Sequence, residues 1–203
     1  MPQVTIIDGG GANIASLQFA LARLGATSEL TADPARILAA ERLILPGVGA
    51  AADAMHRLEQ AGLDKLIPRL TQPFLGICLG MQLLHEASDE ANTRCLGIIP
   101  GRARMFDSAP DRPVPHMGWN RIRKLRDAPL LAGITDGAYF YFVHSYAVDV
   151  MPATVASADY GRAFTAIAGH RNFWGAQFHP ERSGANGAQL LKNFLQLEKL
   201  NTV

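Results

Sequence analysis

The sequence predicts an α/β fold in which a mostly parallel central sheet is flanked by helices, with an additional region of antiparallel strands. Short apolar runs alternate with amphipathic helical patterns as far as residue 84, which is typical of parallel strands joined by crossover helices. Beyond residue 96 the short apolar runs follow one another without such helices, which favours antiparallel pairing. The chain has 203 residues, 48% of them hydrophobic, so it can bury a full core, and we expect one domain over residues 1–203.

The first half of the chain supplies the parallel part of the expected sheet. Strands are predicted at residues 4–7, 27–30, 42–45 and 73–78, with helical patterns from 14, from 33, at 50–59 and at 63–70. The first helix has the clearest signals, because Asn13 can cap its start and Gly25 can close its end. Sheets of this kind place their functional sites at the carboxyl ends of the strands.

The second half of the chain is expected to form antiparallel strands and one last helix. Apolar runs at residues 138–143, 154–158, 164–168 and 173–178 read as the strands. The final helix is amphipathic, with Leu191, Phe194 and Leu195 on its apolar face. No repeat, low-complexity tract or linker interrupts these elements.

The fourth predicted strand ends at a cysteine, in the string Gly76-Ile77-Cys78-Leu79-Gly80. An apolar strand that stops at such a residue and continues as a helix is typical of the strained turn that lifts a nucleophile above a sheet. Glycines two residues to either side avoid a collision across the turn, and the start of the helix favours a thiolate. Cys78 is therefore the candidate nucleophile, the alternative being a small buried residue in a Gly-rich turn.

A cysteine nucleophile needs a base and a group that orients the base. His179 follows an apolar run, so its imidazole should emerge at a strand end, where it can take the thiol proton and return it to a leaving amine. Glu181 lies two residues on, across a proline, and can accept a hydrogen bond from the far ring nitrogen. His179 alone is best interpreted as a hydrogen-bonded histidine at a strand end, but together with Cys78 it favours a Cys-His-Glu triad.

Another central strand ends in the Gly-rich string Pro46-Gly47-Val48-Gly49. Such a turn can present backbone N–H groups to the neighbouring strand end, which suits an oxyanion hole shared with the N–H of Leu79. An ordinary strand-to-helix turn explains the same residues equally well.

Composition and charge argue against several classes of function. The net charge is +1 with Lys and Arg scattered, so nothing indicates nucleic acid or a membrane surface as a partner. Cys78 and Cys95 offer no disulfide framework, and a nucleophilic Cys78 must stay reduced, so we expect a cytoplasmic protein. The N-terminus has no basic signal-like segment, and no apolar run approaches a membrane-spanning length. No cluster has metal-ligand spacing, so we expect no metal and no other cofactor.

The strings Pro46–Gly49, Gly76–Gln82 and His179–Glu181, in this order and on this length, resemble the class I (triad) glutamine amidotransferase family. The match runs from Asp8 to the last helix. Met81 narrows the choice within the family, because relatives that feed anthranilate, guanylate or carbamoyl phosphate synthesis usually carry His at that place.

Two further strings, Pro115–Asn120 and Tyr139–Tyr146, resemble the branch of this family that acts in histidine biosynthesis as one subunit of a synthase. The resemblance implies that Cys78 attacks the side-chain amide of L-glutamine, with His179 and Glu181 completing the triad, and that ammonia leaves as a thioester forms.

The resemblance also implies where substrate and partner bind. The positions that hold glutamine or its oxyanion fall on Gly47, Val48, Gly49, Leu79, Gln82, His144, Ser145 and Tyr146. The contact with a cyclase subunit, a (β/α)8 barrel that receives the ammonia, falls near Asn13, Trp119, Tyr141 and Arg182. The family's Asp-Tyr-Gly-x-Gly-Asn opening is here Asp8-Gly9-Gly10-Gly11-Ala12-Asn13, so the interface role of this loop rests on the asparagine that is retained.

Three classes of function compete. They are a glutaminase that works as half of a synthase, a free-standing cysteine hydrolase of the same fold such as a γ-glutamyl peptidase, and a non-catalytic binding or regulatory domain. The intact set of Cys78, His179 and Glu181 argues against the last class. The strings around Trp119 and Tyr141 favour the first class over the second.

Overall fold

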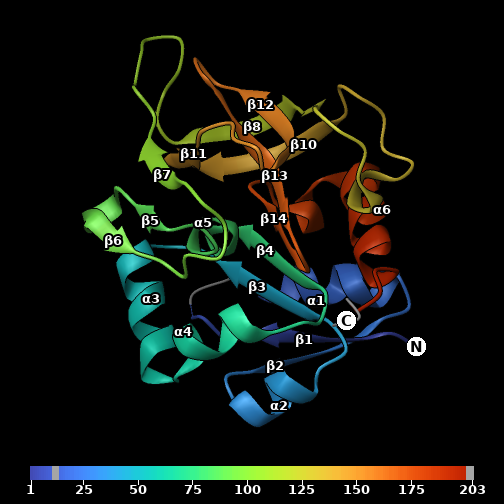
Figure 1. The fold of residues 1–203 in the computed structure, drawn as a ribbon. Coiled ribbons are helices and arrows are strands. Elements are labelled where there is room, and N and C mark those ends of the chain that lie inside the picture. The colour runs from blue at the N-terminus through green and yellow to red at the C-terminus, as the bar shows by residue number, and fades with distance from the viewer. Residues whose placement is uncertain (11–13, 200–203) are drawn as a thin grey trace.

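The structure, a computed structural model, describes residues 1–10 and 14–199 and is built around an eight-stranded sheet (Figure 1). The strand order is β2-β1-β3-β4-β14-β13-β12-β9. Neighbouring strands run parallel from β2 to β14. From β14 to β9 they run antiparallel, so the sheet changes character at β14, beside the strand that carries the candidate nucleophile.

The strands of the central sheet are β1 (Gln3–Ile7), β2 (Thr27–Thr31), β3 (Leu43–Gly47), β4 (Phe74–Cys78), β9 (Arg123–Lys124), β12 (Thr154–Asp159), β13 (Ala163–His170) and β14 (Phe173–Ala176). A four-stranded sheet contains β11 (Tyr146–Val148), β7 (Arg102–Met105), β5 (Ala87–Ser88) and β6 (Thr93–Arg94). An antiparallel ribbon pairs β10 (Tyr139–His144) with β8 (His116–Arg121).

The helices are α1 (Ile14–Arg23), α2 (Pro34–Ala39), α3 (Ala51–Gln60), α4 (Leu63–Leu66), α5 (Leu79–Leu83) and α6 (Gly184–Leu195). Four short 3₁₀ helices join them within the described residues, namely η1 (Ile67–Arg69), η2 (Glu90–Asn92), η3 (Pro129–Leu131) and η4 (Pro180–Arg182). No helix in residues 1–10 and 14–199 is both long enough and apolar enough to cross a membrane.

Two apolar cores cover the two faces of the central sheet. Successive residues of β4 point to opposite faces, so Leu75 and Ile77 join the core that includes α1 and α6, whereas Phe74 joins the core that includes α3 and α4. Figure 1 shows these two helix pairs on opposite sides of the sheet. All five residues of β4 are buried, which explains why its sequence is continuously apolar instead of alternating.

The first half of the chain confirms the predicted strands and helices to within two residues at most boundaries. The pattern at residues 63–70 is the exception, because α4 ends at Leu66 and a 3₁₀ turn follows. Pro68 lies in that turn and has no backbone N–H, so it cannot continue the hydrogen bonds of an α-helix.

The second half differs from the prediction in how its strands pair. β12 and β13 pair antiparallel as expected, but β14 pairs antiparallel with β13 on one edge and parallel with β4 on the other. The strands β7, β8 and β11 were not predicted. In β8 most side chains are exposed or half-buried, so its sequence, His-Met-Gly-Trp-Asn-Arg, lacks the apolar alternation that marks a half-buried strand.

Candidate active site

Cys78 lies at the carboxyl end of β4, directly before α5. Its backbone angles are φ 53° and ψ −112°, a combination that a residue with a side chain adopts only where the surroundings enforce it. The cysteine is 6% exposed. Gly47, at the end of β3, is its partner in the parallel ladder, so the Gly-rich turn that follows β3 lies beside the sulfur. The predicted strained turn at Cys78 is confirmed.

Three glycines allow the backbone to pack this closely. A Cβ atom on Gly80 would lie 1.8 Å from the carbonyl oxygen of Leu45, and one on Gly76 would lie 2.6 Å from the carbonyl oxygen of Gly80. A Cβ atom on Gly47 would lie 2.9 Å from the backbone nitrogen of Gly80. Non-bonded atoms do not approach so closely, so β3, β4 and α5 can meet here only through glycine.

His179 and Glu181 form a buried pair after β14. Nδ1 of His179 donates a hydrogen bond of 2.8 Å to Oε1 of Glu181, and the two side chains are 9% and 8% exposed. This bond leaves Nε2 of the imidazole as the nitrogen that is free to exchange a proton with a reacting group. Nε2 is buried and has no protein hydrogen-bond partner of normal geometry.

The pKa of His179 is raised to about 10. Burial disfavours the charged imidazole, but the carboxylate of Glu181 and the thiolate form of Cys78 outweigh it, because both negative groups favour the protonated ring. The thiol form of Cys78 has no such charge and donates to the carbonyl oxygen of Val143, at 3.7 Å. A protonated imidazole is the charge that stabilises a neighbouring thiolate.

Ser183 fixes the backbone around His179. Its hydroxyl group donates to the carbonyl oxygen of His179 at 2.7 Å and accepts from the backbone N–H of Tyr141 at 2.9 Å. The backbone N–H of His179 in turn donates to the carbonyl oxygen of Tyr141 at 2.9 Å. The histidine is therefore attached to β10, the strand that forms the opposite wall of the site. Sequence reasoning missed Ser183, whose partners are distant in the chain or belong to the backbone.

The predicted residues converge on a cavity of about 310 Å³. Of the residues expected from the sequence, it is lined by Val48, Gly49, Cys78, Leu79, Gln82, His144, Ser145, Tyr146 and His179. Gly47, Glu181 and Arg182 line a second cavity, of about 120 Å³, which shares Val48, Val143 and His179 with the first. Glu90 and Gln177 were not predicted, although Glu90 lines the larger cavity and the Gln177 amide contacts the cysteine sulfur.

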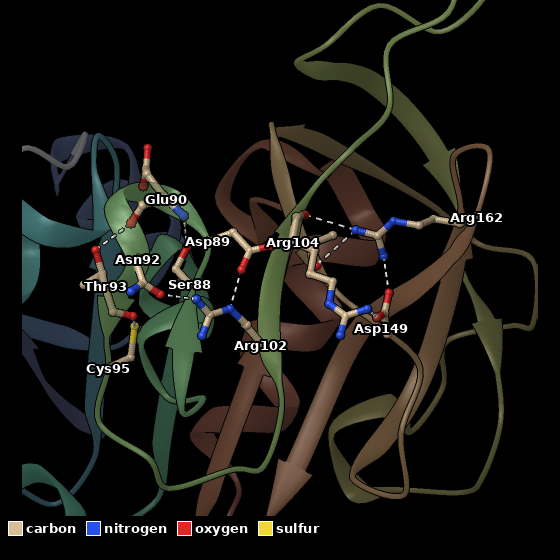
Figure 2. A network of polar contacts seen from close by, with 11 residues as sticks. Ser88, Asp89, Glu90, Asn92, Thr93, Cys95, Arg102, Arg104, Asp149 and Arg162 are labelled. Carbon is tan, nitrogen blue, oxygen red and sulfur yellow. Dashed lines mark hydrogen bonds and ion pairs between the residues drawn. The ribbon is translucent and has the colours of Figure 1, made fainter.

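Glu90 projects from a strained turn that Arg102 holds in place (Figure 2). Ala91 and Asn92 have φ values of 51° and 49°, which is unusual for residues other than glycine. The Arg102 guanidinium group contacts the side chains of Asp89 and Asn92, on the two sides of the glutamate. The turn therefore depends on an arginine from the neighbouring strand β7.

The carboxylate of Glu90 also reaches the helix that follows the Gly-rich turn. Its Oε2 accepts a hydrogen bond of 2.7 Å from the backbone N–H of Ala51, the first residue of α3. Ala50, at the cap position, cannot supply such a bond itself. Glu90 thus connects the cavity to the segment after Gly49, whose φ is 91° and around which there is open space.

A directed chain of hydrogen bonds leads away from the cavity. The carbonyl oxygen of Tyr146 can only accept, so Nδ1 of His144, 2.8 Å away, must carry a proton. Nε2 of His144 then accepts from Nδ1 of His116 at 3.1 Å, and Nε2 of His116 accepts from the Asn120 amide at 3.3 Å. Burial lowers the pKa of His144 to about 3 and that of His116 to about 4, so both rings are neutral, as this chain requires.

The three described residues of the predicted partner contact lie together on the surface. Trp119 is 56% exposed and packs edge-to-face on Tyr141, with ring centroids 6.1 Å apart. The guanidinium group of Arg182 lies 4.7 Å from the centre of the Tyr141 ring. Asn13 lies outside the described residues. Within residues 1–10 and 14–199, no group of three or more His, Cys, Asp or Glu side chains is arranged to hold a metal ion.

Comparisons with known proteins identify relatives of this chain. Residues 5–197 match the family described as "Glutamine amidotransferase class-I". The chain is 52% identical to the imidazole glycerol phosphate synthase subunit HisH of Xylella fastidiosa (strain Temecula1), over 98% of this chain and 99% of the relative. It is 50% identical to the subunit of the same name from Haemophilus influenzae (strain 86-028NP), over 97% and 98% of the two chains.

Solved structures share the fold at much lower identity. PurLQS from Thermotoga maritima superimposes with a TM-score of 0.71 at 17% identity, over 96% of this chain and 97% of the other. A glutamine amidotransferase from the same organism superimposes with a TM-score of 0.67 at 17% identity, over 94% and 80% of the two chains. At this identity the likeness supports the α/β fold and carries no information about the substrate.

Proposed function

The chain belongs to the class-I glutamine amidotransferase family, and from that premise we propose that it is the glutaminase subunit of an imidazole glycerol phosphate synthase. In this role it hydrolyses L-glutamine to glutamate and ammonia, and passes the ammonia to a cyclase subunit. The cyclase makes imidazole glycerol phosphate and AICAR in histidine biosynthesis. The observation that carries the proposal is that Cys78, His179 and seven of the eight predicted oxyanion and substrate residues line one cavity, in a chain that matches HisH relatives over nearly its full length.

The proposed reaction uses the triad in two steps. The sulfur of Cys78 attacks the side-chain amide carbon of glutamine, and the C–N bond breaks as His179 gives its Nε2 proton to the leaving nitrogen, which departs as ammonia. The product of this step is a glutamyl thioester. Water then loses a proton to His179 as it attacks the thioester, and the C–S bond breaks to release glutamate and the thiolate. Glu181 holds the imidazole in the tautomer that both steps need.

The oxyanion formed in each step needs hydrogen-bond donors beside the sulfur. We assign these donors to the backbone N–H of Leu79 and to one N–H of the Gly47–Gly49 turn, because both segments border Cys78 in the cavity. Gly49 has a φ of 91°, and as a glycine it has the backbone freedom that reorienting a peptide of this turn requires.

The remaining cavity residues suit the two ends of glutamine. Glu90 offers a carboxylate for the α-ammonium group, and the turn from His144 to Tyr146, between β10 and β11, offers backbone and hydroxyl groups for the polar end of the substrate. Gln82 and Tyr146 lie within hydrogen-bonding distance of each other, so they form one side of the substrate site together.

The proposed surface for the cyclase subunit, a (β/α)8 barrel, contains Trp119, Tyr141 and Arg182. An exposed tryptophan and a half-buried tyrosine next to an arginine are the residue types that often contribute most to binding energy in protein interfaces. Asn13 is assigned to the same contact from the family pattern. We further propose that residues 1–203 form one glutamine amidotransferase domain and that the protein acts in the cytoplasm.

Two measurements test this function. Replacing Cys78 by Ala should abolish glutamate release, at a cost of about 10³-fold or more, while ammonium salt still supports the synthase reaction of the complex. Glutamate release by the wild-type chain should rise strongly when the cyclase subunit, with its ligand bound, is added. Equal rates with and without the cyclase subunit would contradict the synthase role and favour a free-standing hydrolase of the γ-glutamyl peptidase type.

A further inference from the structure

Gln177 is a fully buried amide directly before the segment that carries the triad histidine. It is 0% exposed and lies between β14 and His179. A buried amide without hydrogen-bond partners costs folding free energy, so the partners of Gln177 indicate what the residue does. The side chain contacts two residues of the candidate site, Gln82 and Cys78.

A backbone carbonyl group fixes which way both amides point. The carbonyl oxygen of Tyr146 can only accept, so the Gln82 atom 2.9 Å away must be Nε2. The second N–H of Gln82 points to an atom of Gln177 at 3.1 Å, which must therefore be the acceptor Oε1. The opposite end of the Gln177 amide is then Nε2, a donor, and it faces the sulfur of Cys78 at 3.9 Å. Flipping either amide would oppose two donors or two acceptors.

We propose that Gln177 is a catalytic residue of this site, which donates an N–H to the Cys78 thiolate and fixes the Gln82 amide for the substrate. In the thiol form the S–H group donates to the carbonyl oxygen of Val143 at 3.7 Å. Loss of that proton leaves the sulfur facing a carbonyl oxygen that repels it. The N–H of Gln177 and the protonated His179 are the donors that remain among the contacts described above.

The same network determines what Gln82 offers to a ligand. Both N–H groups of its amide are used inside the protein, on Tyr146 and Gln177. Gln82 lines the cavity, so the group left for a substrate is its carbonyl oxygen, an acceptor. An acceptor at this place favours a ligand that presents N–H donors, such as an ammonium or amide group, over one that presents a carboxylate. This part of the inference rests on the proposed function, because it takes glutamine as the ligand.

The sulfur can be tested without any assumption about the substrate. Iodoacetamide alkylation of the full-length chain, followed across pH and assigned to Cys78 by peptide mass, reports how readily the thiolate forms. The other titratable groups around the sulfur are His179 with its partner Glu181, and His144, Tyr146 and Glu90 in the lining of the same cavity. These five groups are unchanged in the variants described next, so a shift of the profile reports on Gln177.

Gln177→Glu replaces the donor by a carboxylate, and Gln177→Met removes both polar ends at similar size. We expect the pH midpoint of alkylation to rise by about one unit or more in Gln177→Glu, and by less in Gln177→Met. Gln72→Glu is the matched control, because Gln72 is 5% exposed and its amide also bridges a donor and an acceptor, at Thr71 and Leu38. The control should leave the midpoint unchanged. If Gln177→Met retained the wild-type profile, or Gln177→Glu shifted it no more than the control, the assignment would be overturned.

Glutamine kinetics in the complex with the cyclase subunit test the second half of the proposal. Gln177→Met frees the Gln82 amide to rotate, so KM for glutamine should rise about tenfold in addition to any loss in kcat. An unchanged KM would contradict the claim that Gln177 fixes the Gln82 amide for the substrate. If the wild-type complex released no glutamate, the proposed function would fail instead, while the alkylation profiles would still decide the contact between Gln177 and the sulfur.

Discussion

The hydroxyl group of Ser183 donates a hydrogen bond of 2.7 Å to the carbonyl oxygen of His179, and both residues are buried. Ser183→Ala would leave a backbone N–H of β10 without a partner and would leave that carbonyl oxygen with the backbone N–H of Arg182 as its one remaining donor among the described hydrogen bonds. We expect kcat for glutamine hydrolysis to fall about tenfold at nearly constant KM, because the histidine loses its position and the substrate contacts do not. Ser157→Ala, a buried serine on β12, is the control. Equal kcat values in the two variants would contradict the positioning role.

Because the pKa of His179 is raised, the free energy of unfolding should fall as pH rises into the alkaline range. Its folded pKa is raised to about 10 from an ordinary value of 6.5, so between these values the folded state binds a proton that the unfolded state has lost. The stabilisation from the protonated ring is therefore complete below pH 6.5 and lost as pH rises toward 10. Urea unfolding of wild type and His179→Gln near pH 6, 8 and 10 should show a difference that shrinks with pH. A difference that grows with pH would mean that the ring is neutral in the folded protein.

Arg102 should affect substrate binding from outside the cavity. Arg102→Gln removes the contacts that hold the strained turn around Glu90, so we expect KM for glutamine to rise about tenfold with a smaller change in kcat. Ammonium-dependent activity of the complex should not change, because it bypasses the glutamine site. Arg104→Gln is the matched control on the same strand, since Arg104 pairs with Asp149 (Figure 2). If KM rose equally in both variants, the cause would be a general disturbance of strand β7 and not the loss of the contacts around Glu90.

Trp119 should contribute to binding of the cyclase subunit and little to folding. Its side chain is 56% exposed, so Trp119→Ala exposes little new surface in the free chain. Loss of a large aromatic anchor from an interface costs about 2 kcal/mol or more, so we expect Kd for the cyclase subunit to rise at least about 30-fold. Titration calorimetry measures this change, and the melting temperature of the free chain is the control. A wild-type Kd would place the interface elsewhere.

Gly80 should tolerate no side chain. The added methyl group of Gly80→Ala would lie 1.8 Å from the carbonyl oxygen of Leu45, so β3 and α5 would have to separate. We expect a loss of about 3 kcal/mol or more in the free energy of unfolding, measured by urea denaturation. Gly25→Ala is the comparison, because Gly25 has a φ of 75° and open space around it, so only the backbone conformation costs about 1 kcal/mol. Equal losses would show that the close packing at Gly80 can relax.

The parts of the site that the sequence predicts are those whose causes are local. The turn at Cys78 is recognisable because the glycines that permit it lie two residues away on either side. The pairing of His179 with Glu181 is likewise a contact between residues two apart in the chain. Roles that depend on distant partners were missed. The bond from Gln82 to Gln177 joins residues 95 apart, and that from Ala51 to Glu90 joins residues 39 apart.

The same reason explains the error in the fold. The run at 173–178 has the composition of a strand, and β14 is there, but its parallel neighbour β4 lies about 100 residues earlier in the chain. Composition describes the faces of a strand and says nothing about which strands occupy its two edges. The antiparallel expectation came from the short connection to the preceding strand, and it is correct for that edge alone.

The ribbon of β10 and β8 connects the proposed cyclase surface to the cavity, because both are built on the same two strands. Tyr141 faces Trp119 at one place in the ladder, and three residues further along His144 faces His116. Three residues of extended chain span about 10 Å and cannot lengthen, so the distance between Tyr141 and His144 along the strand is fixed. A partner that shifts the ribbon along its length at Tyr141 would therefore shift His144 by the same distance, as long as the pairing of β10 with β8 keeps its register. The backbone of the ribbon alone would then couple a movement at the surface to the position of His144 in the cavity, with no chain of side-chain contacts between them.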